Sequence, residues 1–417
     1  MKREDVPTST PAHIARNPSS SGDVLTAPAI MDQRPGNRAF SIVGRQALGY
    51  CLRQIAATQS NSEDDMTHSP DFTTRRRVLA AAGALAGVSL LNGRVAFAQP
   101  KLGRVVYGQG SIDPFFAAGY VALKKGYFSE GGLDVEYLNS QSGPRTNQLL
   151  AAGQIVFGAT AATAAPALTI AGKPATLVFG FDRKLTYANV IVRREDFDSG
   201  KIKSLKDLAG KRVGATQPQS STWLMALYLM QKAGVADKVD IRPLGDLATM
   251  LGALKTGSVS ASMATMSMME QARQEGWGVP IFDATTESSW NEFMGGDVPG
   301  IAALTLEDTI QKRPEVVQAF VTAMVKAQDF ITANTAAGIT DVIYDDYLNA
   351  FPRAAIEKTL GVYKDTVFLK DNLITEDAYN RMTAIMGDGR QFSNDEIKTV
   401  PYAKCVNMGF VRKARGL

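Results

Sequence analysis

The sequence predicts a two-lobed α/β protein in which each lobe is a mostly parallel sheet flanked by helices. Residues 104–138 pass from an apolar strand through a loop and a helical pattern to a second strand, which is typical of a parallel strand-helix-strand unit. Loops rich in Gly, Ser and Thr follow several strands, and the plan of the first half recurs in the second. Because parallel sheets bind ligands beyond the carboxyl ends of their strands, these loops are the expected functional site.

The first 98 residues are expected to precede the folded part. Residues 1–65 are polar and lack an apolar period, which predicts a disordered extension, and we hypothesise that translation starts at Met66. Residues 66–98 read as a twin-arginine export signal, in which three arginines precede a short apolar run and a small-x-small cleavage site that ends at Ala98. A membrane anchor is the alternative, but the 14-residue run 78–91 is shorter than the roughly 20 residues that span a bilayer.

Composition then limits the function of the remaining residues, 99–417. They carry 34 basic and 33 acidic side chains, so their charge gives no reason to expect a nucleic acid or an anionic membrane as partner. Their length of 319 residues is enough for two packed domains.

Histidine and cysteine restrict the possible chemistry further. Both histidines, His13 and His68, precede the predicted cleavage point, which removes histidine-activated nucleophiles and histidine-ligated metal sites. Cys51 is removed as well, so Cys405 has no partner for a disulfide and is expected to be a structural thiol. The composition does not exclude catalysis by a lysine or a carboxylate side chain, but no motif in the sequence indicates it. The sequence therefore predicts no catalytic residue, no metal and no cofactor.

The first lobe begins with a strand at 105–107, a loop at 108–114, a helix from Phe115 and a strand at 133–138. A helix at 146–152, a short strand at 155–157, a loop at 158–163, a small helix and a strand at 175–179 follow, in that order.

Polar and glycine residues at the ends of these strands are the first candidate ligand contacts. Free N–H groups at helix starts, with hydroxyls beside them, suit an oxygen-rich or anionic group. Capping of the local helices is the open alternative for Ser142 and Thr160. The candidates in this lobe are Gly110, Ser111, Asp113, Phe115, Ser142, Gly143, Thr160 and Ala161.

Residues 179–193 break the helix-strand alternation with two extended segments, which favours a connection between domains. We expect a hinge near 181–188. Asp182 and Arg183 lie where this connection meets the cleft, and either is a candidate to pair with a charged group of a ligand. Solvation at the surface is the open alternative for both.

Two motifs carry a resemblance to a known family. One is Ser-Leu-Lys-Asp-Leu-Ala-Gly-Lys-Arg-Val-Gly at 204–214, and the other is Ala-x-x-x-Gly-Tyr-Phe followed by Gly-Leu-Asp-Val-Glu at 122–136. With these two motifs the chain resembles the periplasmic solute-binding proteins of the nitrate, sulfonate, taurine and thiamine-pyrimidine type. The resemblance extends over roughly residues 101–335. The resemblance implies a type II clamshell fold, a periplasmic location, and delivery of a small solute to the permease and ATPase subunits of an ABC importer.

An internal repeat supports two similar lobes independently. Residues 148–160, followed by Gly-Lys-Pro at 172–174, correspond to residues 252–265, followed by Gly-Val-Pro at 278–280. Chance similarity of α/β units is the alternative. Where the family commonly has an Asp in Gly-x-Val-Asp, this chain has Val156 and Ser260, so substrate assignment by analogy is not justified.

The second lobe supplies a matching set of candidates. The loop 216–222 leads into a helix at 223–232, and its hydroxyls and backbone N–H groups would face the cleft. A run of methionines beside Thr265 is expected to pack in the core, although methionine next to a cleft can also adapt to an apolar ligand. The candidates are Gln217, Ser220, Ser221, Thr222 and Thr265.

The chain is expected to return to the first lobe through a strand at 300–304 and an amphipathic helix at 314–334, and the tail is expected to be scaffold around that lobe. These expectations divide the chain into a first lobe at 99–184 and 296–417 and a second at 185–295.

The sequence thus predicts an exported, monomeric solute-binding protein that closes by a hinge around a small molecule. Aromatic faces such as Phe115 and Phe116, without a charged clamp, favour an organic solute with an apolar part, which is neutral or anionic. Two alternatives stay open: a ligand-sensing module for a membrane receptor, and an enzyme like the thiamine-pyrimidine synthases, which consume a histidine that residues 99–417 lack.

Overall fold

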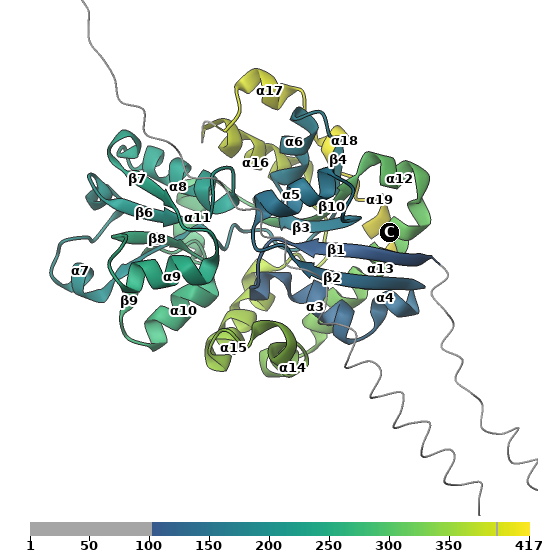
Figure 1. Ribbon diagram of the computed structural model, residues 1–417, viewed down its shortest axis with the longest axis horizontal. Coiled ribbons are helices and arrows are strands. Elements are labelled where there is room, and N and C mark those ends of the chain that lie inside the picture. Colours follow the sequence, from purple (N-terminus) through teal and green to yellow (C-terminus); the bar gives the residue numbers. More distant parts are fainter. Residues whose placement is uncertain (1–101, 389–390) are drawn as a thin grey trace, which may run out of the picture. The chain divides into compact units, whose positions relative to one another are not determined.

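The computed structural model describes residues 102–388 and 391–417 (Figure 1). The predicted extension and export signal lie outside the described residues, so they stay predictions.

The first sheet has five strands in the order β2-β1-β3-β10-β4. β1 pairs in parallel with β2 and β3, whereas β10 runs antiparallel between β3 and β4. The strands are β1 (Gly103–Gln109), β2 (Leu133–Asn139), β3 (Phe157–Ala161), β4 (Ala175–Gly180) and β10 (Ile301–Leu306).

The second sheet repeats this plan in the order β7-β6-β8-β5-β9 (Figure 1). β6 pairs in parallel with β7 and β8, and β5 runs antiparallel between β8 and β9. The strands are β5 (Asn189–Arg193), β6 (Arg212–Ala215), β7 (Asp240–Pro243), β8 (Ala261–Ala264) and β9 (Gly278–Phe282).

Each antiparallel strand directly follows a crossing between the sheets: β5 is the first strand after the chain leaves the first sheet, and β10 is the first strand after it leaves the second. The chain passes from β4 to β5 through residues 181–188, and from β9 through α11 (Glu287–Met294) to β10. The predicted two-lobed α/β fold with mostly parallel sheets is therefore confirmed.

Several boundaries differ from the prediction: α5 and α8 begin at Gly143 and Ser221, before the predicted starts at 146 and 223. β3 runs from Phe157 through Ala161, although the sequence pattern ended the strand at 157 and assigned 158–163 to a loop. These small residues, Gly158 to Ala161, are buried because β3 lies between β1 and β10 at the centre of the sheet. Burial on both faces removes the alternation that reveals a strand in a sequence.

Helices cover the sheets along the whole described chain. In the first sheet's part they are η1 (Pro114–Phe116), α3 (Ala117–Lys124), α4 (Tyr127–Glu130), α5 (Gly143–Ala151) and α6 (Ala164–Ile170). With the second sheet come α7 (Arg194–Asp198), η2 (Leu205–Leu208), α8 (Ser221–Lys232), η3 (Ala236–Lys238), α9 (Leu247–Lys255), α10 (Met266–Gln274) and α11.

The carboxyl-terminal helices touch both lobes, rather than the first alone as the sequence analysis expected. α15 packs against α10 of the second lobe as well as against η1. The helices of this part are α12 (Glu307–Lys312), α13 (Pro314–Ala333), α14 (Ala336–Ile343), η4 (Tyr344–Leu348), α15 (Arg353–Val362), η5 (Tyr363–Val367), α16 (Glu376–Asp388), α17 (Asn394–Lys398), α18 (Tyr402–Cys405) and α19 (Gly409–Arg415).

The cores are apolar and aromatic. The ring of Phe157 stacks on that of Phe320 in α13 with centroids 3.9 Å apart. The methionine run, Met263, Met266, Met268 and Met269, is buried.

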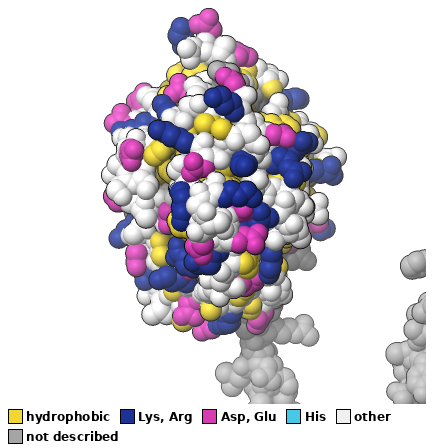
Figure 2. All heavy atoms as spheres, turned by 90° about the vertical axis from the view of Figure 1, so that its left-hand side faces the viewer, with side chains coloured by type: hydrophobic (Ala, Val, Ile, Leu, Met, Phe, Trp, Pro, Cys, Tyr) yellow, Lys and Arg dark blue, Asp and Glu magenta, His cyan; other side chains and the backbone are white. Residues whose placement is uncertain are grey.

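None of the helices in the described residues is long and apolar enough to cross a bilayer. Figure 2 shows basic and acidic side chains mixed over one face of the molecule.

The two crossing segments meet at Gly300. The Asp182 Oδ1 atom accepts hydrogen bonds from the N–H groups of Gly300 and Ile301, at 2.7 and 2.9 Å. A Cβ added at Gly300 would lie 2.8 Å from that oxygen and 3.0 Å from the carbonyl oxygen of Lys184. Glycine is therefore required where the second crossing passes the first.

We expect Gly300→Ala to lower the free energy of unfolding by about 1–3 kcal/mol, because the added methyl group forces the two crossings apart. Gly252→Ala is the matched control, since a Cβ there meets no atom within 4 Å and alanine favours the helix interior. Urea unfolding of both variants measures the difference. Equal stability of the two would contradict this account of the crossing.

Candidate ligand-binding cleft

A cavity of about 40 Å³ lies between the two lobes and is called the inner cavity below. From the first lobe it is lined by Gly110, Ser111, Phe115, Ser142, Gly143, Thr160 and Ala161, and from the second by Ser220, Ser221, Thr222 and Thr265. All of these are predicted site residues. They meet here because the carboxyl ends of β1, β3, β6 and β8 open toward the same cavity.

Three helices begin at this cavity. Ser142, Ser220 and Thr265 are the N-caps of α5, α8 and α10, and each side-chain oxygen accepts a hydrogen bond from an N–H in the first turn of its helix. The capping role and the cavity-lining role therefore coincide. Helix N-termini carry partial positive charge and free N–H groups, so the cavity favours a group with several oxygen atoms.

A hydroxyl network fixes the loop before α8. The Thr216 Oγ1 atom lies 2.7 Å from Ser220 Oγ and 2.8 Å from Thr222 Oγ1. The backbone N–H of Thr216 also donates to Thr222 Oγ1 at 2.9 Å. Because these contacts hold the side chains in place, binding a ligand orders few additional groups.

The first lobe brings α5 unusually close to the end of β3. A Cβ added at Gly143 would lie 2.7 Å from the Thr160 Oγ1 atom. A side chain at position 143 would therefore push the helix N-terminus away from the cavity.

Hydrogen bonds join the two lobes around the cavity. The Ser142 hydroxyl donates to Gln217 Oε1 at 3.4 Å, and the Ser267 hydroxyl of α10 donates to the Asp113 carboxylate. Gln217 and Asp113 do not line the inner cavity; they contribute to contacts between the lobes instead.

The Asp113 and Asp182 carboxyls are buried behind the cavity wall. Burial raises the pKa of Asp113 to about 6, although hydrogen bonds from Ser267, Thr265 and the Phe115 N–H oppose the shift. Burial raises the pKa of Asp182 to about 8, and its Oδ2 atom has no hydrogen-bond partner. Asp182 is therefore placed to join the two crossings rather than to touch a ligand in the inner cavity, and its neighbour Arg183 pairs with Asp297 at 2.7 Å.

Aromatic and aliphatic side chains complete the lining, and the sequence analysis missed several residues. Phe116 was recognised as an aromatic face, whereas Gln141, Tyr187, Thr216, Leu247 and Ile301 were not proposed. Tyr187 lies in the first chain crossing and Ile301 at the end of the second. Both would have been candidates if the residues of the predicted hinge had been added to the list of site residues. No Asp, Glu, Lys or Arg lies among the described residues that line the inner cavity.

Gln141 has a left-handed backbone with a φ of 68°, which is uncommon for a residue other than glycine. The Asn139 side chain accepts a hydrogen bond from its N–H at 3.0 Å and so supports this conformation. Strain of this kind often marks a binding site.

The described residues hold no group of three or more His, Cys, Asp or Glu side chains arranged to bind a metal ion. Cys405 is buried, and burial raises the pKa of its thiol.

The model of the NMT1/THI5-like family matches residues 113–337, which is more than half of the 417 residues. The chain belongs to the NMT1/THI5-like family. This NMT1/THI5-like protein is 26% identical over 322 residues to YtlA of Bacillus subtilis (strain 168), which carries the name of a binding protein; the match covers 76% of this chain and 91% of YtlA.

Solved structures share its fold. A protein of Bordetella bronchiseptica RB50 matches with a TM-score of 0.67 and 23% identity, over 75% of this chain and 97% of that one. The ligand-binding component of an ABC-type import system from Staphylococcus aureus, solved with zinc bound, matches with a TM-score of 0.59 and 13% identity, over 75% and 98% of the two chains. These likenesses confirm the type II clamshell fold of the NMT1/THI5-like protein.

The two buried carboxyls predict a pH-dependent stability. Each has a folded pKa above its unfolded value of about 4, so its stabilising contribution is complete below that pH and declines as the pH rises. The decline ends near pH 6 for Asp113 and near pH 8 for Asp182. The free energy of unfolding should therefore fall between pH 6 and 8, by at most about 1.4 kcal/mol per pH unit.

Asp182→Asn should remove most of the fall between pH 6 and 8. The amide oxygen still accepts from Gly300 and Ile301, while the amide nitrogen replaces an oxygen that has no partner. The described residues contain no histidine, the side chain that ordinarily titrates in this pH range. Denaturant unfolding at several pH values tests the prediction, which fails if wild type and variant show the same pH dependence.

Proposed function

We propose that this protein is an extracytoplasmic solute-binding protein, which captures a small organic solute, neutral or anionic, between its lobes and delivers it to the permease and ATPase subunits of an ABC importer. The observation that carries the proposal is the convergence of three helix N-termini and their hydroxyl caps on one cavity between two similar sheets. No charged side chain of residues 102–388 or 391–417 lines that cavity, which favours recognition by hydrogen bonds and helix dipoles.

The arrangement of the chain supports capture by hinge closure. In this proposal residues 102–184 and 296–417 form one lobe and residues 185–295 the other, so two connections join the lobes. The Ser142 hydroxyl bonds to Gln217 directly across the cleft, and a solute that bridges both lobes would favour the closed arrangement in the same way.

Delivery to an importer and a periplasmic location rest on similarity. The relative YtlA is named as a binding protein, and the Staphylococcus aureus neighbour is described as part of an ABC-type import system. Export through the twin-arginine signal and action as a monomer belong to the same proposal, and a small-molecule solute is its expected ligand.

A thermal-shift screen of organic acids, sulfonates, amides and pyrimidines tests solute capture. A solute that binds the folded state alone stabilises it by about 2.7 kcal/mol at 100 times its Kd, which raises the melting temperature. A screen in which no solute class raises the melting temperature would contradict the proposal.

Bulky substitutions at the cavity should abolish that stabilisation. Ser221→Phe places a ring at the first turn of α8, where the side chain lines the inner cavity, and Ser111→Phe does the same from the first lobe. Ser288→Phe is the matched control, because Ser288 is an exposed residue in the first turn of α11. If calorimetry shows that both cavity variants bind the ligand with wild-type affinity, Ser111 and Ser221 do not belong to the site.

A further inference from the structure

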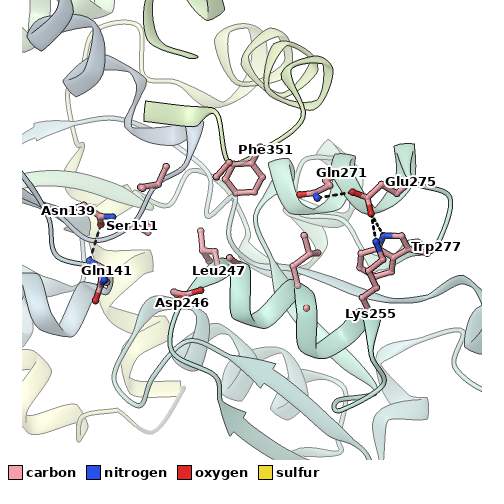
Figure 3. Close-up of a pocket in the computed structure, with 15 residues that line it drawn as sticks. Ser111, Asn139, Gln141, Asp246, Leu247, Lys255, Gln271, Glu275, Trp277 and Phe351 are labelled. Atoms are coloured by element: carbon pink, nitrogen blue, oxygen red, sulfur yellow. Dashed lines mark hydrogen bonds and ion pairs between the residues drawn. The ribbon is translucent and has the colours of Figure 1, made fainter. Parts of the chain in front are cut away.

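A second, larger chamber adjoins the inner cavity and is called the outer chamber here. Its volume is about 460 Å³, and it shares Ser111, Gln141 and Leu247 with the inner cavity as lining residues. Figure 3 shows Ser111 and Gln141 on one side of it, Leu247 and Phe351 in the middle, and the Lys255 and Glu275 pair at the far side. The two spaces therefore lie next to each other, with these three residues between them.

The middle of the outer chamber is apolar and is built from both lobes. Ile112 of the first lobe and Phe351, just before α15, line it together with Leu247 and Leu251 of the second lobe. Trp277 lies at the far side, beside the Lys255 and Glu275 pair (Figure 3). Aliphatic and aromatic side chains of this kind gain from burying an apolar group of a ligand.

Two of the three charged side chains that line the outer chamber, Lys255 and Glu275, pair with each other. Glu275 accepts hydrogen bonds from Lys255 at 2.7 Å, Trp277 Nε1 at 2.7 Å and Gln271 at 2.8 Å, and the Lys255 hydrogen bond is the main reason that its pKa falls to about 2. The Asp246 carboxylate accepts from the Thr249 N–H at 2.8 Å as the N-cap of α9. A ligand in this chamber therefore meets no unpaired cation among these residues, whereas the partner of Asp246 is a backbone N–H rather than a cationic side chain.

The volumes of the inner cavity and the outer chamber suit two different parts of one solute. About 40 Å³ holds a few water-sized groups, which is enough for a compact polar group and too little for an organic molecule. The outer chamber at about 460 Å³ lies within the range of small-molecule sites.

We propose that the solute is an elongated amphipathic molecule, whose compact polar head binds in the inner cavity and whose apolar body lies in the outer chamber against Leu251, Trp277 and Phe351. This inference rests on the proposed function, because it names the class of solute that the same cleft selects. Gln141 and Leu247 lie at the junction of head and body.

Chain length is the first test. Calorimetry with straight-chain carboxylates, sulfonates and primary amides, from acetate and its counterparts up to the eight-carbon members, should show binding that tightens about three- to fourfold per methylene group once the body enters the outer chamber. Affinity that does not increase with chain length would overturn the inference and leave solute capture intact. Failure of every member in all three series to bind would count against the proposed function as well.

Filling the outer chamber is the second test. Gly252 lies in α9 and lines the chamber, and an added Cβ meets no atom within 4 Å, so Gly252→Phe fits the helix while its ring occupies the space for the body. We expect about tenfold or weaker binding of octanoate and unchanged binding of the shortest member that binds wild type.

Gly361→Phe is the matched control, because Gly361 lies in α15 outside the chamber lining and its added Cβ would be 3.8 Å from Ala336. It should leave both affinities unchanged. The inference is wrong if Gly252→Phe weakens short and long solutes equally, or weakens neither.

Discussion

The Asp182 carboxyl joins the two segments through which the chain passes between its sheets. It lies on the first crossing and accepts hydrogen bonds from Gly300 and Ile301 on the second. The position of both antiparallel strands, β5 and β10, depends on these crossings, and the strand ends that line the cleft depend on the sheets. Burial makes this carboxyl costly to ionise and raises its pKa to about 8, so Asp182 is mostly protonated at pH 7 while its Oδ1 atom still accepts both hydrogen bonds.

The cleft combines two kinds of recognition in two adjoining spaces. In the inner cavity, helix N-termini, hydroxyls and close glycine contacts present fixed donors to a small polar group. In the outer chamber, apolar side chains from both lobes surround a larger volume, and Lys255 pairs with Glu275. A solute that spans both spaces contacts both lobes, so its binding energy is coupled to closure.

Short apolar runs followed by Gly, Ser and Thr residues located the strands in the sequence, although β3 continues to Ala161, past its predicted end at 157. Ser142, Ser220 and Thr265 line the cavity for the reason that made them candidates, since each caps a helix at a strand end. Asp113 and Asp182 were candidates that do not line the inner cavity. The sequence of a loop does not distinguish a polar side chain that contacts a ligand from one that bonds to another segment of the protein. Phe351 and Trp277 were beyond local patterns, because packing between distant segments brings them together.

The electron density of a solute crystallised with the protein tests the central claim most directly. The account predicts density for a polar group between the N-termini of α5, α8 and α10, in contact with residues of both lobes. Density confined to one lobe, or at a surface away from this cleft, would contradict it.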